Sequence, residues 1–104
     1  MRVTTQDRFE DARITKTLDV VKGNVVRARF FGRDIMAALR MLAGGEVKEY
    51  TKLMAEAREQ AYDRMMARAK ELDADGVVCV RFTTSMVMQG AAEILATGTA
   101  VKLE

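Results

Sequence analysis

The stretch "AEAREQAYDRMMARAKELDAD", residues 55–75, decides how this chain can fold. Its apolar side chains recur every three or four residues, which is the spacing of one face of an α-helix. The same spacing begins upstream of the quoted stretch, and charged residues lie largely off that face. The apolar positions are Tyr50, Met54, Ala57, Ala61, Met65, Ala69 and Leu72. The pattern predicts a helix of about 25 residues and about 40 Å. Because such a helix is long for a domain this small, we expect it to pack beside a neighbouring subunit.

Two strands are predicted after this helix. "DADG", residues 73–76, is typical of a turn, and Gly76 is expected near the helix exit. Val77 to Thr84 then shows an apolar pair followed by alternation, which predicts a strand. Gln89-Gly90 predicts a second turn, and residues 93–103 predict a returning antiparallel strand in which Gly98 indicates a close backbone approach, for example at a subunit contact.

Before the long helix the chain is predicted to be first extended and then helical. Residues 13–30 are rich in β-branched side chains and alternate at the period of a half-buried strand. Gly23-Asn24 is compatible with a hairpin turn or with a bulge in one long strand. Residues 32–43 have the apolar spacing of a short helix, which Gly44-Gly45 would end. We therefore predict one α+β domain over residues 1–104, with a small antiparallel sheet packed against one short and one long helix.

Composition excludes several function classes. The formal net charge of +2 indicates neither nucleic acid nor a membrane surface as a partner. The N-terminus lacks the apolar core of a signal peptide and no apolar run approaches the length of a membrane span, so we expect a cytoplasmic protein. The single cysteine, Cys79, fits a reducing compartment. There is no histidine and no tryptophan.

The chemistry available for a site is sparse. Soft metals are bound by clusters of cysteine and histidine, and here Cys79 is the one soft donor. It is either a small core residue or a ligand shared between several subunits around a symmetry axis. Asp73 and Asp75 are interpreted as turn acids, and the methionines on helix faces as core residues. A thiol without a histidine base offers no nucleophilic pair, so we predict that the protein is not an enzyme.

Positive charge is concentrated at Arg27, Arg29, Arg33 and Arg40, with one acid, Asp34, among them. Guanidinium groups gathered in this way could bind phosphate or another anion in an oligomer. The alternatives are a solvated face or ion pairs between subunits. Nucleic acid is not expected as a partner, because the formal net charge of the chain is only +2.

The order and spacing of several motifs resemble one known family. The motifs are "GRD" at 32–34, "AGG" at 43–45, Tyr50, the quoted helix and turn at 55–75, "VV" at 77–78 and "GTAVK" at 98–102. Together they are similar to the YbjQ family, whose name refers to heavy-metal binding. The resemblance implies a dodecin-like subunit assembled as a homopentamer. Cys79 stands where the family usually has a glycine.

Two functions follow as expectations. The first is a homo-oligomeric binding module, with a divalent or soft metal ion as the cofactor implied by the resemblance, Cys79 as its soft donor and carboxylates completing the shell. The second is a pentameric binder of a small anionic or organic ligand, held by Arg27, Arg29 and Arg33 at a cleft between subunits. An enzyme is the third and least supported reading.

Overall fold

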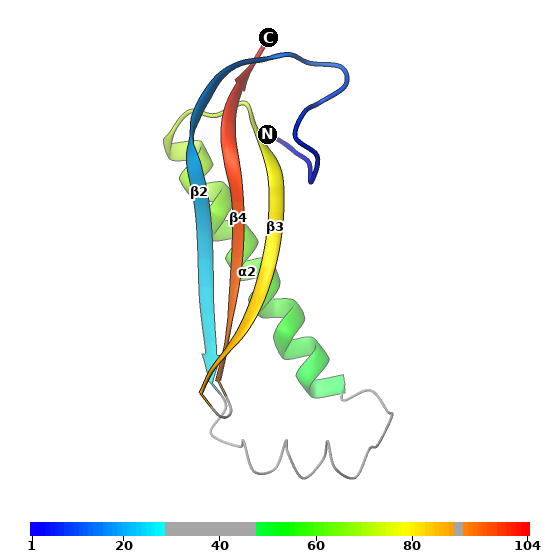
Figure 1. The fold of residues 1–104 in the computed structure, drawn as a ribbon. Helices are drawn as coiled ribbons and strands as arrows, with labels where there is room; N and C mark the ends of the chain where they lie inside the picture. The colour runs from blue at the N-terminus through cyan, green and yellow to red at the C-terminus, as the bar shows by residue number, and fades with distance from the viewer. Residues whose placement is uncertain (29–47, 89–90) are drawn as a thin grey trace.

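The computed structural model describes residues 1–28, 48–88 and 91–104. In chain order its elements are β1 (Arg2–Val3), β2 (Ile14–Ala28), α2 (Lys48–Glu71), β3 (Gly76–Met88) and β4 (Ala91–Leu103). The strands form a four-stranded sheet in the order β1-β3-β4-β2, and α2 crosses one face of it (Figure 1). The predicted α+β class is confirmed. The predicted short helix at residues 32–43 and the turn at Gln89-Gly90 lie outside the described residues.

The sheet is mixed, whereas the sequence predicted an antiparallel one. β2 and β3 both pair antiparallel with β4, but β1 pairs parallel with β3. The residues after β1 continue this parallel contact: the Thr4 N–H donates to the Val77 carbonyl at 3.0 Å, and the Val80 N–H donates to the Thr4 carbonyl at 3.1 Å. A strand of two residues has too few positions to show a periodic pattern, which is why the sequence did not reveal it.

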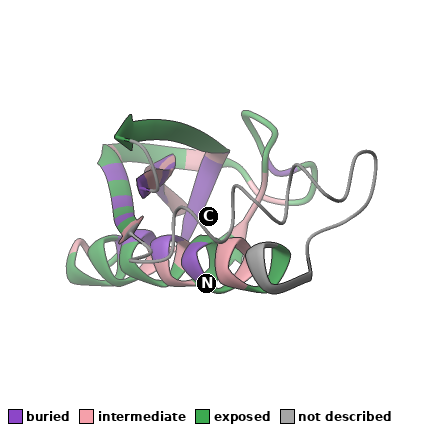
Figure 2. Cartoon of the chain, turned by 90° about the horizontal axis from the view of Figure 1, so that it is seen from below, coloured by how far each residue is buried: buried purple, intermediate pink, exposed green. Residues whose placement is uncertain are grey.

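The long helix is confirmed as α2, with 24 residues. Ala57, Ala61, Met65 and Ala69 are fully buried on the face that meets the sheet, and the outward positions of the helix are exposed (Figure 2). Met54 and Leu72 pack against the same core from its margin. The helix lies mainly over β2 and β4 of its own chain and meets β3 little, so its buried face is explained without a neighbouring subunit.

Gly23 lies where β2 passes closest to α2. β2 runs through this residue without a hairpin, and its register irregularities lie nearer its start, between Ile14 and Lys16 and between Thr17 and Asp19. A β-carbon at position 23 would overlap the carbonyl oxygen of Ala61 and the backbone nitrogen of Met65. β2 is therefore one long strand, which was one of the two predicted alternatives. Gly23 does not mark a bulge in it, however, but provides the space that the helix needs.

The sequence predicted that α2 would end near Gly76, but the helix ends at an earlier residue. Asp73 takes the left-handed conformation, with φ 57°. Its N–H donates to the Lys70 carbonyl at 3.0 Å, and the Ala74 N–H donates to the Ala69 carbonyl at 3.1 Å. This is the Schellman arrangement that ends many helices, here with aspartate in place of the usual glycine. Gly76 instead begins β3.

A second, smaller core lies on the opposite side of the sheet. Val78 and Val101 alternate along their strands with Val77 and Ala100 of the helix-side core, so they point to the other face. Phe9, from the segment between β1 and β2, packs over them together with Ala12, Ile14, Cys79 and Leu103. The end of the sheet near the chain termini is thus covered on both faces (Figure 1).

Gly98 also makes room for a close approach, but within the chain. A β-carbon there would lie 2.5 Å from Cγ1 of Val77 on the neighbouring strand. The suggested subunit contact is not needed to explain this glycine.

Candidate functional site

Cys79 sits at an irregularity of β3. The register of β3 with β4 shifts between Val78 and Arg81, and Cys79 has φ 57°. Its N–H donates to the Gln6 carbonyl at 2.8 Å, and its half-buried side chain packs against the second core. A one-residue bulge whose extra residue is left-handed favours glycine, because other side chains crowd the backbone in that conformation. The cysteine therefore occupies a position whose backbone suits glycine better.

A heavy-metal site is not assembled within one chain. No group of three or more histidine, cysteine, aspartate or glutamate side chains comes together in the described residues. The whole chain has no histidine and one cysteine. Soft metals bind through several thiolates or imidazoles, so the described residues of a single subunit do not fit such an ion.

The two turn acids have structural partners. The carboxylate of Asp75 accepts the N–H of Leu103 at 2.8 Å and lies 3.4 Å from Nζ of Lys102. The hydrogen bond from Leu103, aided by the charge of Lys102, lowers the pKa of Asp75 below its usual value. Asp73 is fully exposed, 3.7 Å from the same ammonium group. These contacts tie the helix exit to β4.

Arg27 is the one member of the predicted arginine cluster that the structure describes; Arg29, Arg33 and Arg40 lie outside the described residues. An Nη of Arg27 donates to Oε1 of Gln60 on α2 at 2.6 Å. Its Nε is buried and has no hydrogen-bond partner among the residues that the structure describes. Burying a charged donor without an acceptor is costly, so this nitrogen is an open position for a carbonyl or anionic oxygen.

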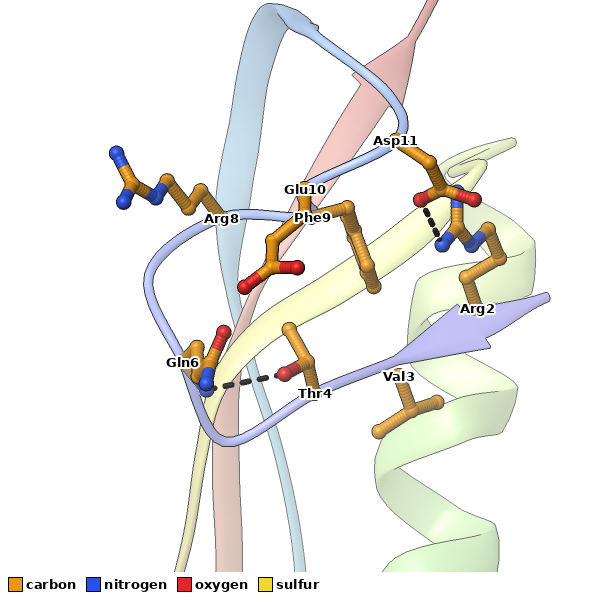
Figure 3. Close-up of a pocket in the computed structure, with 8 residues that line it drawn as sticks. All are labelled: Arg2, Val3, Thr4, Gln6, Arg8, Phe9, Glu10 and Asp11. Atoms are coloured by element: carbon orange, nitrogen blue, oxygen red, sulfur yellow. Dashed lines mark hydrogen bonds and ion pairs between the residues drawn. The ribbon is translucent and has the colours of Figure 1, made fainter.

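A shallow cavity lies under the N-terminal segment, lined by residues from Arg2 to Asp11 (Figure 3). Arg2 forms an ion pair with Asp11, and its guanidinium carbon lies 4.5 Å from the ring centre of Phe9. The ion pair holds the pKa of Asp11 below its usual value. Arg8 points away from this pair in Figure 3. Because the charge of Arg2 is already matched, the cavity offers no concentrated charge to a ligand.

The most unusual surface is the far end of β3. Large apolar side chains are exposed there: Phe82 (43%), Met86 (76%), Val87 (50%) and Met88 (67%). The ring of Phe82 stacks on Tyr62 of α2 with 6.5 Å between centroids, but the helix covers little else of this strand. The sequence predicted that the strand would end near Thr84, so it missed this surface. The uncharged run "FTTSMVM", residues 82–88, was the signal that could have indicated it.

No helix in the described part of the chain is both long enough and apolar enough to cross a membrane.

Comparison with known proteins gives full-length matches. The family model YbjQ_1, described as "Putative heavy-metal-binding", matches residues 1–104. A UPF0145 protein of Methanococcus maripaludis is 51% identical over 104 residues, covering 100% of this chain and 93% of that protein. A UPF0145 protein of Thermotoga maritima is 52% identical over 104 residues, covering 100% of this chain and 98% of that protein.

Among the solved structures with a similar fold is that of a bacterial protein. It is a protein of unknown function from Pediococcus pentosaceus that belongs to the DUF74 family, with a TM-score of 0.67 and 16% sequence identity. The match covers 100% of this chain and 98% of the other. At this identity the likeness concerns the fold alone.

Proposed function

Because the chain belongs to the YbjQ family, we propose that it acts as a homo-oligomeric binding module, a dodecin-like subunit that assembles as a homopentamer. Its binding site would lie between subunits. The family description supports binding as the activity, and the described residues of one chain form no complete site for a heavy metal.

One observation carries the oligomeric part of this proposal: the exposed apolar end of β3 around Phe82 and Met86. Each Å² of apolar surface removed from water contributes about 25 cal/mol. Large apolar side chains grouped on one strand end are typical of a protein contact. A chain of 104 residues also gains comparatively much from burying surface against other copies.

In this proposal a heavy-metal ion would be bound by Cys79 of several subunits, with carboxylates completing the shell. The test is native mass spectrometry of the purified protein with added Cd²⁺, comparing wild type with Cys79→Ser. We expect a stable adduct on the wild-type oligomer and none on the variant. An adduct that survives the substitution would show that Cys79 is not the ligand, and no adduct on either protein would contradict metal binding.

A small anion is the second candidate ligand, and the Nε of Arg27, which is buried without a partner among the described residues, favours it. Arg29 and Arg33 would complete the site at a cleft between subunits. Inorganic phosphate should then raise the thermal midpoint of the wild type, and Arg29→Ala should remove the shift. Sulfate-free buffer with chloride at equal ionic strength is the control. An equal shift in the variant would contradict the role of the arginines.

The proposed role is non-catalytic and cytoplasmic. A thiol acts as a nucleophile when a base or a nearby cation activates it, and the chain has no histidine to do so. One unpaired cysteine is compatible with a reducing compartment.

A further inference from the structure

The outer edge of β3 is covered along part of its length. β1 and the residues up to Gln6 form backbone hydrogen bonds with β3 as far as Val80. From Phe82 to Met88 no strand of the described residues pairs with this edge (Figure 1). A strand edge of this kind presents unpaired N–H and carbonyl groups that another strand can satisfy.

This segment lacks the features that normally protect an edge from pairing. Natural edge strands carry lysine, inward charges or proline, which make pairing with another chain costly. Residues 82–88 contain no charged residue and no proline. Their side chains include Phe82 and Met86 on one face and Val87 near the end, all exposed. The edge is therefore both open and apolar.

The opposite edge of the sheet offers a matching strand. The outer edge of β2 has no strand partner among the described residues, because the sheet order places β2 last, although the carbonyl of Asn24 accepts a hydrogen bond from Nη1 of Arg64 at 2.7 Å. Its first part carries Lys16, Asp19 and Lys22, whereas residues 23–26, "GNVV", carry no charge. Val26 is 53% exposed. Pairing residues 23–26 with residues 82–88 would not remove a charged side chain of either segment from water.

The β2 and β3 segments also match in their position along the sheet and in the direction in which they run. β4 pairs Gly23 and Phe82 with the same residue, Ala96, and pairs Val26 and Ser85 with Glu93. Residues 23–26 are therefore level with residues 82–85, and Met86 is level with Arg27, because both of these pair with Ala92. β2 and β3 are both antiparallel to β4, so they run in the same direction. A rotation about an axis along the strands would place β3 of one copy beside β2 of the next, parallel and level.

We propose that the β3 edge from Phe82 to Met88 binds the β2 edge of a second copy of this chain at residues 23–26, which continues the sheet from subunit to subunit. This inference rests on the proposed homo-oligomer and assigns its interface. Within one chain β4 separates the two edges, so a different copy must supply the partner. A contact between two different edges of identical chains is head to tail, and when it closes into a ring every copy of the two segments is paired.

Two substitutions on opposite faces of the same strand test the proposal. Met86→Lys places a charge on the helix side and Ser85→Glu places the opposite charge on the other side, and both residues are exposed, so each chain should still fold. Native mass spectrometry of the full chain should show an oligomer for the wild type and its loss in both variants. Val20→Lys is the matched control: Val20 is 66% exposed on β2 but pairs with Thr99, level with Val78, where the N-terminal segment already covers β3.

The outcomes separate this inference from the proposed function. A monomeric wild type would overturn both. An oligomer that persists in Met86→Lys and Ser85→Glu would leave the proposed oligomer standing and overturn this interface. Loss in one variant alone would mean that copies meet through a face of the sheet, which also contradicts pairing at the edge. Circular dichroism of each variant verifies that loss of assembly is not loss of fold.

Discussion

The two ends of the sheet differ in how completely the chain covers them. Near the termini, Phe9 and its neighbours cover one face, α2 covers the other, and the N-terminal segment pairs with the edge of β3. At the far end, Phe82 and Met86 are exposed, and beyond Val80 no strand of the described residues pairs with the outer edge of β3, the edge opposite β4. The end near the termini is therefore stabilised by contacts within the chain. The far end exposes apolar side chains of the kind found at protein interfaces.

A pair of phenylalanines gives the largest contrast between the two ends. Phe9→Ala should lower the free energy of unfolding by about 3 kcal/mol, because it opens a cavity over Val78 and Val101. Phe82→Ala should cost the isolated subunit less than about 1 kcal/mol, because 43% of the side chain is already exposed. Urea denaturation at a concentration where subunits are dissociated measures both. Equal costs would contradict the comparison.

Gly23 tests how closely α2 must approach β2. Gly23→Ala should cost about 2 kcal/mol, because its β-carbon overlaps the backbone of the helix and must push α2 away from the sheet. Asn24→Ala, at the next and exposed position, is the control and should stay within about 0.5 kcal/mol of the wild type. Thermal denaturation followed by circular dichroism compares them. A tolerated alanine at 23 would mean that the helix does not sit where the structure places it.

Cys79 lies between the two ends, where the edge of β3 stops being paired. Cys79→Val should cost about 1 kcal/mol although valine is more apolar, because a β-branched side chain is disfavoured at φ 57°. Cys79→Gly should cost less than Cys79→Val, since glycine adopts this conformation without crowding. Urea midpoints of the two variants decide the order. A valine variant more stable than the glycine variant would show that packing, not backbone conformation, governs this position.

The smallest effect on stability is expected from acidification, through Asp75 at the end of the sheet near the termini. The hydrogen bond from Leu103 and the charge of Lys102 lower the pKa of Asp75 in the folded chain. A group whose pKa is lowered by folding contributes stability above its unfolded pKa, near 3.9, and that contribution disappears as pH falls through the folded value. Wild type should therefore lose more stability than Asp75→Asn on acidification below pH about 4. If wild type and Asp75→Asn lost the same stability on acidification, Asp75 would make no such contribution.

Periodicity predicted the elements that have a clear inside and outside. The helix over Lys48–Glu71 and the strands β2 and β4 were expected because their buried positions recur at fixed spacing. β1 was missed because two residues have no period, and β3 was predicted too short because residues beyond Thr84 are exposed on both faces. Alternation of buried and exposed positions disappears where the chain leaves a strand uncovered.

The candidate site was less predictable for a similar reason. The left-handed conformations of Asp73 and Cys79 depend on where the helix ends and how the strands pair, and the cysteine residue type does not indicate such a conformation. At Cys79 the family's usual glycine was the one available signal. The role of Gly23 depended on which helix would cross it, a tertiary contact that local composition cannot specify. The arginine cluster remains a prediction at Arg29 and Arg33, which lie outside the described residues.

Native mass spectrometry of the freshly purified, full-length wild type tests the central claim most directly. The claim is that this chain is one subunit of a homo-oligomer whose contact involves the exposed end of β3. The account predicts a pentamer, which should separate into single chains on denaturation, because no covalent bond is expected to join the subunits. A protein that remains monomeric across micromolar concentrations would contradict it, since the apolar end of β3 would then be exposed to water in the native state.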